Sequence, residues 1–442
     1  MKRLSLAVLC LTGCLTSGAL AADNADRGLR LGPVKIDRNA ELSDRVLDFQ
    51  EGLTGEAPYL LRKLKAGELD GDTIYLGGSI RGGLYSENTN TDGKFPILSR
   101  FPNQHGTDGE NTDAVIQNAA LTVTGNVGKW VTGFLQVEHS EVFFRPDEDN
   151  VQVREAYVVV GNLAESPFYA AVGRKTIDFG QFDTFTPFTH SVNQHYFWAL
   201  SEDPVVELGY VGDTFRVSGT LISGERQTRV ALSDNDDFAG NFAVKAEKFF
   251  TLDRIGGKLR LSSSYLHDTI YRNNFTAHTR EALMRMGPPN APEFPPIFVE
   301  DRVGLMNAAA YLSMKRFDLG AEYTRATDDW PATSFSAITG EVYQDVPALQ
   351  AITVQGRYRF ELAGREAALS GVLSRGIFGP EDTEFDHADQ HSAALEWAAL
   401  PFLDLGVEYV YNNGFQPFVG IQEASDTGVE SHTIIIGGDA RF

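Results

Sequence analysis

From Thr73 onward the chain alternates between apolar and polar residues with a period of two. The segments 215–223, 353–360 and 403–411 each carry apolar side chains at every second position, with polar or charged side chains between them. This period is typical of β-strands that have one apolar and one polar face. No segment shows a convincing helical period, so the alternation predicts strands over most of the chain.

The connections between these segments alternate in length. Short connections such as 125–129 and 211–214 follow long ones such as 87–113 and 176–202. Strict alternation places every long loop at one end, as in bacterial outer-membrane barrels, and a soluble sandwich has no reason to keep that rule. The predicted fold is all-β: a transmembrane antiparallel β-barrel of about 16 strands at residues 73–442, with short periplasmic turns and long extracellular loops. The strands are expected to begin near residues 73, 114, 130, 151, 168, 203, 215, 238, 258, 301, 317, 348, 366, 387, 402 and 431.

Residues 1–21 have the pattern of an export signal. Lys2 and Arg3 precede an apolar core from Leu4 to Leu15, and Ala19-Leu20-Ala21 matches the small-x-small cleavage site. A competing interpretation is that 11–14, Leu-Thr-Gly-Cys, forms a lipoprotein box that leaves Cys14 lipidated. With cleavage after Ala21 the mature chain contains no cysteine, which excludes disulfides and thiolate metal sites.

The segment 22–72 is polar and charged. It contains one plausible short helix, Tyr59 to Leu69, and the rest is expected to be flexible. We expect it to be a periplasmic N-terminal segment. The segment is too short to fill a barrel, so we expect no energy-coupling plug domain.

The overall charge and hydropathy narrow the function classes. The chain has 38 basic and 60 acidic residues, a net charge of −22; without Lys2 and Arg3 the balance is 36 − 60 = −24. Such acidity disfavours binding to nucleic acid. No run of eighteen apolar residues occurs, which excludes a helical membrane protein but not a membrane barrel, whose strands average to a hydrophilic composition.

The polar faces of the predicted strands would line an aqueous lumen. Their charges balance, which assigns most of the acidic excess to the long loops. The inward basic residues are Arg81, Arg154, Arg174, Arg216, Lys245, Arg260 and Arg357, and the inward acidic residues are Glu138, Glu207, Glu247, Glu322, Glu396, Glu408 and Asp439. Sixteen strands enclose a channel unless something fills it.

The loop at 176–202 is the best candidate for a constriction. Its first half is rich in phenylalanine, which would be a liability in water, so we expect this loop to fold in and pack against the inner wall. The residues expected to set the constriction are Asp178, Phe179, Gln181, Asp183 and His190, with the polar ones facing the pore.

The last strand carries an independent mark of an outer-membrane barrel. Ile434, Ile436 and Ala440 share one face, and the chain ends on Phe442. This pattern resembles the terminal signal by which such barrels are recognised for assembly. We therefore expect the outer-membrane assembly machinery, the lipid bilayer and lipopolysaccharide as partners, with Phe442 as the assembly signal.

The segment 172–183 (Val-Gly-Arg-Lys-Thr-Ile-Asp-Phe-Gly-Gln-Phe-Asp) resembles the Gly-Arg/Gln-x-x-x-Pro-Phe-Gly-x-Phe-Asp/Glu motif of the phosphate-selective porin O/P group and of the LbtU-type siderophore porin family. Segments 322–327 and 405–409 are weaker matches to the second family. The resemblance implies a sixteen-stranded outer-membrane channel with a folded-in loop, often trimeric in the first group. The chain departs from these families in having Asp178 where they tend to have proline, one short helix in place of a long N-terminal coiled coil, and no lysine-rich lining.

Three functions are set against each other. The first is a bacterial outer-membrane porin for passive diffusion of small hydrophilic solutes or ions. We expect this protein to have no cofactor. The second is a selective uptake channel for an iron-siderophore. The third, a barrel enzyme of the phospholipase type, is supported only by His190 beside Ser191, and we expect no catalytic residue. We also expect no metal site, because His387 and His391 lie about 13 Å apart on an extended strand.

Overall fold

The computed structural model describes ten parts of the chain: residues 29–31, 34–92, 109–141, 151–199, 204–222, 241–269, 303–328, 348–377, 387–415 and 426–442. The export signal expected at residues 1–21, with Cys10 and Cys14, lies outside these residues, as do the tips of most long loops. No helix in the described parts has the length and apolar character needed to span a membrane.

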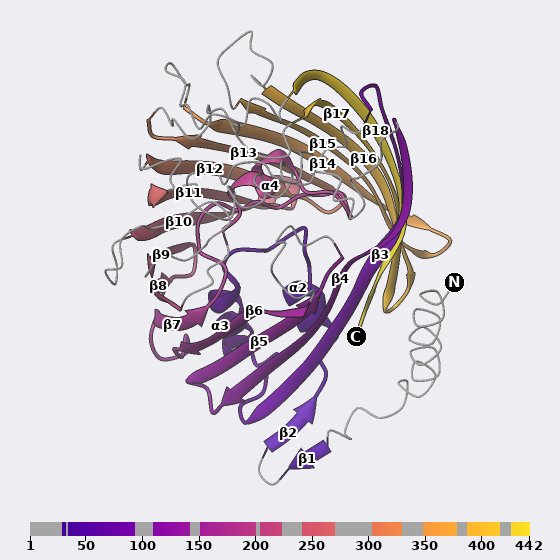
Figure 1. Cartoon of the computed structure of the whole chain (residues 1–442). Helices are drawn as coiled ribbons and strands as arrows, with labels where there is room; N and C mark the ends of the chain where they lie inside the picture. The colour runs from indigo at the N-terminus through magenta and orange to yellow at the C-terminus, as the bar shows by residue number, and fades with distance from the viewer. Residues whose placement is uncertain are drawn as a thin grey trace, which may run out of the picture.

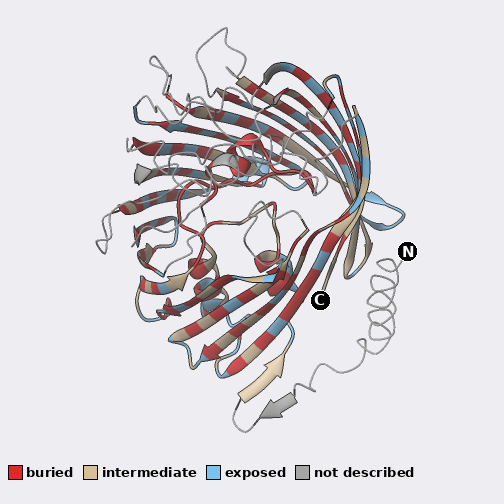
Figure 2. Cartoon of the chain, viewed as in Figure 1, coloured by how far each residue is buried: buried red, intermediate tan, exposed pale blue. Residues whose placement is uncertain are grey.

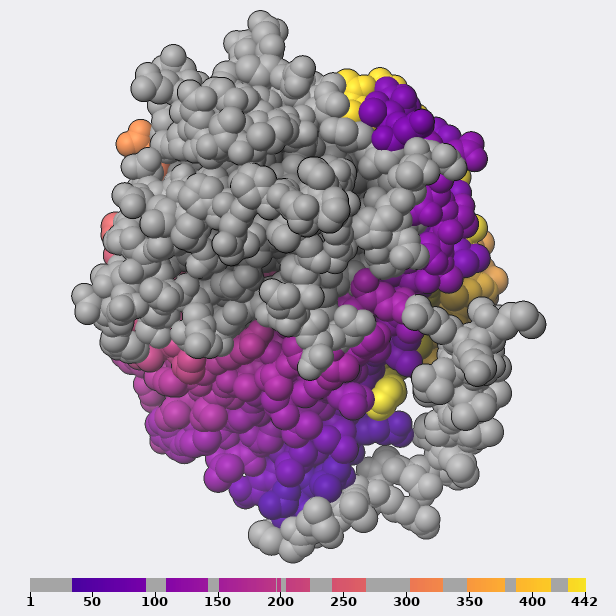
Figure 3. Space-filling view, in the orientation of Figure 1, coloured from indigo at the N-terminus to yellow at the C-terminus, as the bar shows by residue number. Residues whose placement is uncertain are grey.

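Sixteen antiparallel strands of the described residues close into a barrel (Figure 1). The first strand pairs with the last, from Ser431 opposite Thr89 to Arg441 opposite Ser79. Figure 3 shows this seam where the yellow end of the chain meets purple strand β3. The strands are β3 (Thr73–Thr89), β4 (Glu110–Val127), β5 (Val131–His139), β6 (Val151–Val160), β7 (Phe168–Arg174), β8 (Val205–Val211), β9 (Phe215–Ile222), β10 (Asn241–Leu252), β11 (Gly257–Thr269), β12 (Val303–Ser313), β13 (Phe317–Ala326), β14 (Gln350–Leu362), β15 (Arg365–Ile377), β16 (His387–Leu400), β17 (Leu403–Phe415) and β18 (Asp426–Arg441).

The predicted barrel and its alternation of short and long connections are confirmed. Most strands begin within three residues of the expected position. The largest differences are at β4, which begins at Glu110, and β18, which begins at Asp426. Both strands extend farther toward the long loops than the apolar alternation indicated, because polar residues continue the backbone ladder there. The short turn between β10 and β11 contains the 3-10 helix η3 (Asp253–Ile255).

Burial alternates along most of the barrel wall in step with the apolar pattern (Figure 2). Leu121 is 61% exposed and Val172 is 49% exposed on the outer face, whereas Glu408 is fully buried on the inner face. An exposed apolar surface that continues around a whole barrel is compatible with lipid and not with water. The sequence pattern therefore places apolar side chains on the outer face and polar side chains on the inner face, as predicted.

The N-terminal segment differs from the expectation of one short helix and a flexible remainder. It contains β1 (Leu29–Leu31), β2 (Val34–Asp37), α2 (Ala40–Val46) and α3 (Glu56–Ala66). Strand β2 adds in parallel to the start of β3, and Asn39 caps α2 by accepting from the N–H of Leu42. Helix α3 ends where Gly67 adopts a left-handed conformation, φ 75°, which a residue with a side chain rarely accepts.

Two β-bulges turn additional polar side chains inward. Register shifts on β4 and β6 leave one extra residue on each strand, Gln117 and Arg154. Each bulge brings two consecutive residues into the interior, so that Gln117 and Asn118 are both buried, as are Arg154 and Glu155. Bulges re-aim side chains in this way at the cost of a locally interrupted ladder.

Candidate functional site in the barrel interior

Helices α2 and α3 lie inside one side of the barrel, near its short-turn end (Figure 1). Their apolar residues form a core with inward-facing aromatic and aliphatic residues of β3–β8. The members of this core are Leu42, Val46, Leu47, Ala57, Leu60, Leu61, Leu64, Leu69, Tyr75, Ala120, Phe134, Tyr157, Val159, Leu163, Tyr169, Ala171 and Val211. Contrary to the expectation from its length, the N-terminal segment therefore fills part of the lumen, because burying these apolar side chains removes them from water.

The long loop between β7 and β8, described at residues 175–199, also folds into the barrel and carries α4 (Val192–Phe197). Its backbone is held by side chains of the wall. Glu322, 3% exposed, accepts from the N–H groups of Gln181 at 2.9 Å and Phe182 at 2.8 Å. Glu408 accepts from the N–H of Phe188 at 2.8 Å. The two carboxylates thus anchor the loop instead of facing an open pore.

The turn at Gly180 and Phe182 explains part of the sequence motif. Gly180 has φ 65° and Phe182 has φ 59°, both in the left-handed region. A Cβ on Gly180 would lie 2.1 Å from the Phe182 ring, so only glycine fits there. The fully buried ring and the two bonds to Glu322 offset the unfavourable backbone conformation of Phe182.

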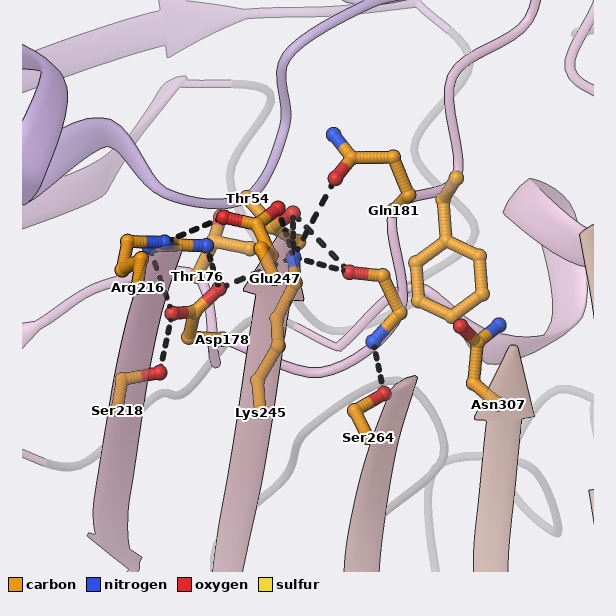
Figure 4. A network of polar contacts seen from close by, with 12 residues as sticks. Thr54, Thr176, Asp178, Gln181, Arg216, Ser218, Lys245, Glu247, Ser264 and Asn307 are labelled. Atoms are coloured by element: carbon orange, nitrogen blue, oxygen red, sulfur yellow. Dashed lines mark hydrogen bonds and ion pairs between the residues drawn. The ribbon is translucent and has the colours of Figure 1, made fainter. Parts of the chain in front are cut away.

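Asp178 lies at the centre of a network of charges on β9 and β10 (Figure 4). Its carboxylate is 2.9 Å from Arg216 Nη1 and 3.2 Å from Lys245 Nζ, and Ser218 Oγ donates to it at 2.6 Å. Glu247 pairs with Arg216 on its other side. Burial would raise the pKa of Asp178, but attraction to Arg216 and Lys245 holds that pKa well below its usual range. The carboxylate is the counter-ion that lets two cationic side chains be buried.

The N-terminal segment and the loop contact one another as well as the wall. Gln50 Nε2 donates to the carbonyl oxygens of Thr186 at 2.6 Å and Thr189 at 2.9 Å. The N–H of Gly52 donates to Asp183 at 2.6 Å. Lys245 joins both segments, since its Nζ donates to Thr54 Oγ1 at 2.8 Å and to the Gly180 carbonyl. Loop and N-terminal segment therefore form one plug, defined here as residues 40–69 and 175–199.

The structure corrects the expected orientation of the constriction residues. Asp178, Gln181 and Asp183 are buried against the wall and the N-terminal segment; Asp183 pairs with Arg260. Phe179 is fully buried, as expected for a loop that packs inward, and His190 is buried at 2% exposure. The polar side chains turn to the wall because the wall supplies cations that need counter-ions.

Most of the predicted lining residues lie in the interior and are engaged by partners. Arg154 pairs with Glu138 at 2.7 Å. Lys175 pairs with Glu207 at 2.5 Å. Arg216 and Arg260 are described above. Arg357 pairs with Glu51 and Asp318, and Arg81 bonds to Gln50 and Gln117.

Arg174 is not part of the central network. It is half-buried at the end of β7, and its Nε donates to the Arg154 carbonyl at 3.1 Å. Gly173, with φ 139°, precedes it and interrupts the regular alternation on which the inward prediction depended.

Sequence reasoning missed the plug partners Gln50, Glu51, Thr54 and Lys175. None of them lies on an alternating strand, so the period of two carries no information on where they point. Only Lys175 lies within a motif that the sequence analysis identified, the segment 172–183.

The structure shows where the residues of the two chemical alternatives, a catalytic serine and a histidine metal site, lie. The Ser191 side chain caps α4 by accepting from the N–H of Gln194. His387 and His391 both lie on β16, and no group of histidine, cysteine and carboxylate side chains suited to a metal occurs in the described parts of the chain.

Sequence comparisons match part of the chain. A family described as a protein of unknown function (DUF3573) matches residues 64–247. The chain is also similar to a protein of Coxiella burnetii (strain RSA 493 / Nine Mile phase I) named UPF0422 protein, with 23% identity over 182 residues. That match covers 39% of this chain and 32% of the other protein, so the chain spans about a third of that relative's length.

Solved structures share the fold over most of the chain. OprB of Pseudomonas putida is 11% identical, with coverage of 89% of this chain and 99% of that one and a TM-score of 0.54. An anion-selective porin from Comamonas acidovorans is 9% identical, with 84% and 99% coverage and a TM-score of 0.50. OmpF of Salmonella typhi, in complex with daunomycin, is 14% identical, with 84% and 97% coverage and a TM-score of 0.50. The likeness is one of fold: a bacterial porin barrel.

Proposed function

We propose that the protein is an outer-membrane porin, a water-containing channel through which small hydrophilic solutes or ions diffuse passively. The observation that carries this proposal is the closed sixteen-stranded barrel of the described residues, apolar outside and polar inside. A polar lumen behind an apolar wall gives a hydrophilic solute a path across lipid. The folded-in loop 176–202 is the constriction, and the short turns face the periplasm.

Aromatic side chains at the short-turn end support a membrane setting. Phe168 and Phe215 each contact Tyr210 there, and Phe317 and Tyr358 form a second group farther around the wall. Aromatic rings concentrate at the two membrane interfaces of outer-membrane barrels, where one part of the ring meets lipid and another meets water.

Planar-bilayer recording tests the channel proposal. The purified, refolded chain is expected to migrate faster on gels before heating than after it, and to give stepwise conductance. A heat-modifiable barrel that never conducts, at any applied voltage, would contradict the porin function. Conductance without heat-modifiable migration would point to a contaminant and calls for a repeat with the variants described below.

Selective uptake of an iron-siderophore is the second candidate, favoured by the plug that occupies much of the lumen. A general diffusion pore gains nothing from filling its own cross-section, whereas a selective channel does. Addition of a ferric siderophore is expected to block the current at micromolar concentration if this candidate holds, and inorganic phosphate serves as the matched competitor. Equal, weak effects of both solutes would favour the general pore.

The oligomer and the membrane partners are also proposals. The resemblance of residues 172–183 to the porin O/P group supports a homotrimer, and the acidic long loops support contact with lipopolysaccharide through divalent ions. Most of those loop residues lie outside the described parts. Native mass spectrometry in detergent, with and without lipopolysaccharide, distinguishes a monomer from a trimer and detects bound lipid.

We also propose that the barrel is not an enzyme. Ser191 is used as a helix cap, which competes with a role as a nucleophile. An assay of phospholipase activity on reconstituted protein is expected to show no more product than Ser191→Ala.

A further inference from the structure

Two sectors of the barrel interior are filled in the described residues. The apolar core of α2 and α3 occupies the sector of β3–β8 near the short turns. The network around Asp178, together with the loop bonds to Ser264 and Glu322, occupies the sector of β9–β13 (Figure 4). The loop also bonds to β14, β15 and β17, through Gln355, Ser374 and Glu408. A hydrated route past the plug is therefore expected through the cavities that remain between plug and wall.

Three cavities remain between the plug and the wall, in order from the turn between β16 and β17 to the inner faces of β4–β6. The mouth cavity, about 390 Å³, lies at the turn between β16 and β17. The central cavity, about 150 Å³, shares Asp404 and Arg441 with it. The inner cavity, about 30 Å³, is lined by Glu138 and Arg154 and shares Arg81 and Phe188 with the central one. Because neighbouring cavities share lining residues, they form one line through the described interior.

Arg81 stands at the boundary between the central and inner cavities. Its side chain is 4% exposed, and its guanidinium connects three parts of the molecule. Nε donates to Gln117 Oε1 at 2.9 Å on the wall, and Nη2 donates to Gln50 Oε1 at 3.2 Å and to the Phe188 carbonyl at 3.3 Å on the plug. These partners are neutral, so the guanidinium joins wall and plug without being neutralised by any of them.

The central cavity carries excess negative charge. Five carboxylates line it against three guanidinium groups, so 3 − 5 leaves a formal excess of two negative charges; the acids are Asp48, Glu51, Glu396, Asp404 and Asp439, and the bases are Arg81, Arg357 and Arg441. Glu51 pairs with Arg357, and Asp439 pairs with Arg441 at 2.8 Å. Glu396 and Asp404 have no ion-pair partner within 4.0 Å in the described parts.

Two further observations indicate that this charge serves a solute. Asp404 lies directly opposite Asp439 on the neighbouring strand, a like-charge pairing that costs stability. Asp439 is 8% exposed, and its Oδ1 atom has no hydrogen-bond partner among the described residues. A buried carboxylate oxygen without a donor is costly unless water or a cation reaches it.

We propose that solutes cross along this line of cavities, that the central cavity favours cations, and that Arg81 controls passage between the central and inner cavities. The inference rests on the proposed channel function and adds its route and its preferred ion class. A cation is held by the carboxylates of the central cavity, and the Arg81 guanidinium must leave its plug partners for the cation to continue inward.

Ion selectivity tests the route. Wild type, the double variant Glu396→Gln/Asp404→Asn, and the control Asp253→Asn are recorded in planar bilayers under a KCl gradient. Asp253 is exposed in the short turn between β10 and β11, outside the line of cavities. The double variant is expected to lower the K⁺ to Cl⁻ permeability ratio by about fivefold, since a unit charge at 4 Å contributes about 1 kcal/mol even in water. The control is expected to match wild type.

The role of Arg81 is tested by conductance. Arg81→Gln is expected to raise single-channel conductance about twofold, because the shorter neutral side chain opens the boundary and no longer repels cations. Arg81→Lys keeps the charge and is expected to leave selectivity nearer to wild type. Heat-modifiable migration confirms that each variant is folded.

A thiol reaction gives a second measurement, of whether position 396 is reached from the channel. A cationic thiol reagent is expected to reduce the current of Glu396→Cys and to leave that of Asp253→Cys unchanged. The proposed route would be overturned if wild type, the cavity variants and the Asp253 controls all conduct with the same selectivity, conductance and thiol response. That result would leave the channel function intact. Absence of current from every folded protein would overturn the channel function itself.

Discussion

At the scale of single residues, the interior is organised by buried charges that satisfy one another across the plug boundary. Asp178 is 1% exposed and serves two cations of the wall. The porin motif that residues 172–183 resemble tends to have proline at this position, which can neither pair with Arg216 nor accept from Ser218. The departure in sequence therefore corresponds to a specific contact that joins the loop to the wall.

Asp178→Asn is expected to lower the free energy of unfolding by about 3 kcal/mol, because it removes one of the two carboxylates that Arg216 and Lys245 share and leaves Glu247 to balance both buried cations. Urea-induced unfolding in detergent measures the change. Asp253→Asn serves as the control and is expected to leave stability unchanged. Equal stability of the two variants would show that Asp178 is not the counter-ion on which the network depends.

Glu56, at the start of α3, makes the plug sensitive to pH. Burial, followed by the neighbouring Glu155, raises the pKa of Glu56 well above its ordinary 4.5. The folded state therefore binds this proton more tightly than the unfolded state. The associated stability is retained below about pH 4.5 and falls as the pH rises from there toward the raised pKa.

Glu56→Gln is expected to reduce this pH dependence. At pH 8 the neutral side chain removes the repulsion with Glu155, so hydrogen exchange of residues 40–66 is expected to slow by about fivefold, equivalent to about 1 kcal/mol. At pH 4 the variant and wild type are expected to exchange alike. Faster exchange of the variant at pH 8 would contradict a destabilising carboxylate at this position.

At the scale of elements, the loop and the N-terminal segment depend on each other. Gln50, Gly52 and Thr54 bond to the loop, and the Gln194 side chain in α4 bonds back to the carbonyl of Phe49. Helix α2 has only seven residues, and α3 has eleven, lengths that are marginal for helices in isolation. Both helices depend on packing against the barrel for their stability.

Shortening the loop within 176–202 is expected to raise single-channel conductance by about twofold or more, because it removes the larger part of the constriction. It is also expected to speed proteolysis of residues 40–54, which lose their loop partners. Planar-bilayer recording and mass spectrometry of the fragments measure the two effects. Unchanged conductance together with unchanged proteolysis would show that loop and segment do not act as one plug.

At the scale of the whole molecule, the barrel is closed by its last residues. The N–H of Phe442 donates to the Gly78 carbonyl at 3.0 Å, and the N–H of Gly78 donates back to Phe442 at 3.0 Å. The Phe442 ring lies over Gly78, where a Cβ would come within 2.4 Å of it. The terminal residue thus completes the ladder between the first and last strands and leaves its ring 46% exposed on the outer side.

Deletion of Phe442 is expected to reduce the amount of assembled barrel in the outer membrane several-fold, because it removes both closing bonds and the exposed terminal ring. Phe442→Tyr retains the backbone pair and an aromatic ring and is expected to assemble normally. Heat-modifiable protein in outer-membrane fractions measures the outcome. Normal levels after the deletion would exclude Phe442 as an assembly signal.

The sequence by itself determined the wall. The sixteen strands and the side on which most of their residues lie follow from a local period of two, because a strand that separates lipid from a polar lumen must alternate. The positions where this period stops also give the alternation of short and long connections. The inward positions of Arg81, Glu322 and Glu408 were predictable for that reason. The resemblance to the phosphate-selective and siderophore families stays a prediction.

Only the tertiary structure decided what fills the lumen. Whether Glu322 faces water or holds a loop depends on backbone N–H groups 140 and 141 residues away in sequence, and no local pattern encodes such a meeting. The apolar residues of α2 and α3 gain their burial from aromatic residues of β3–β8, so their role appears only once the barrel exists. The periodicity of a strand can be recognised within the strand, whereas the burial of the plug residues depends on the wall residues that they contact.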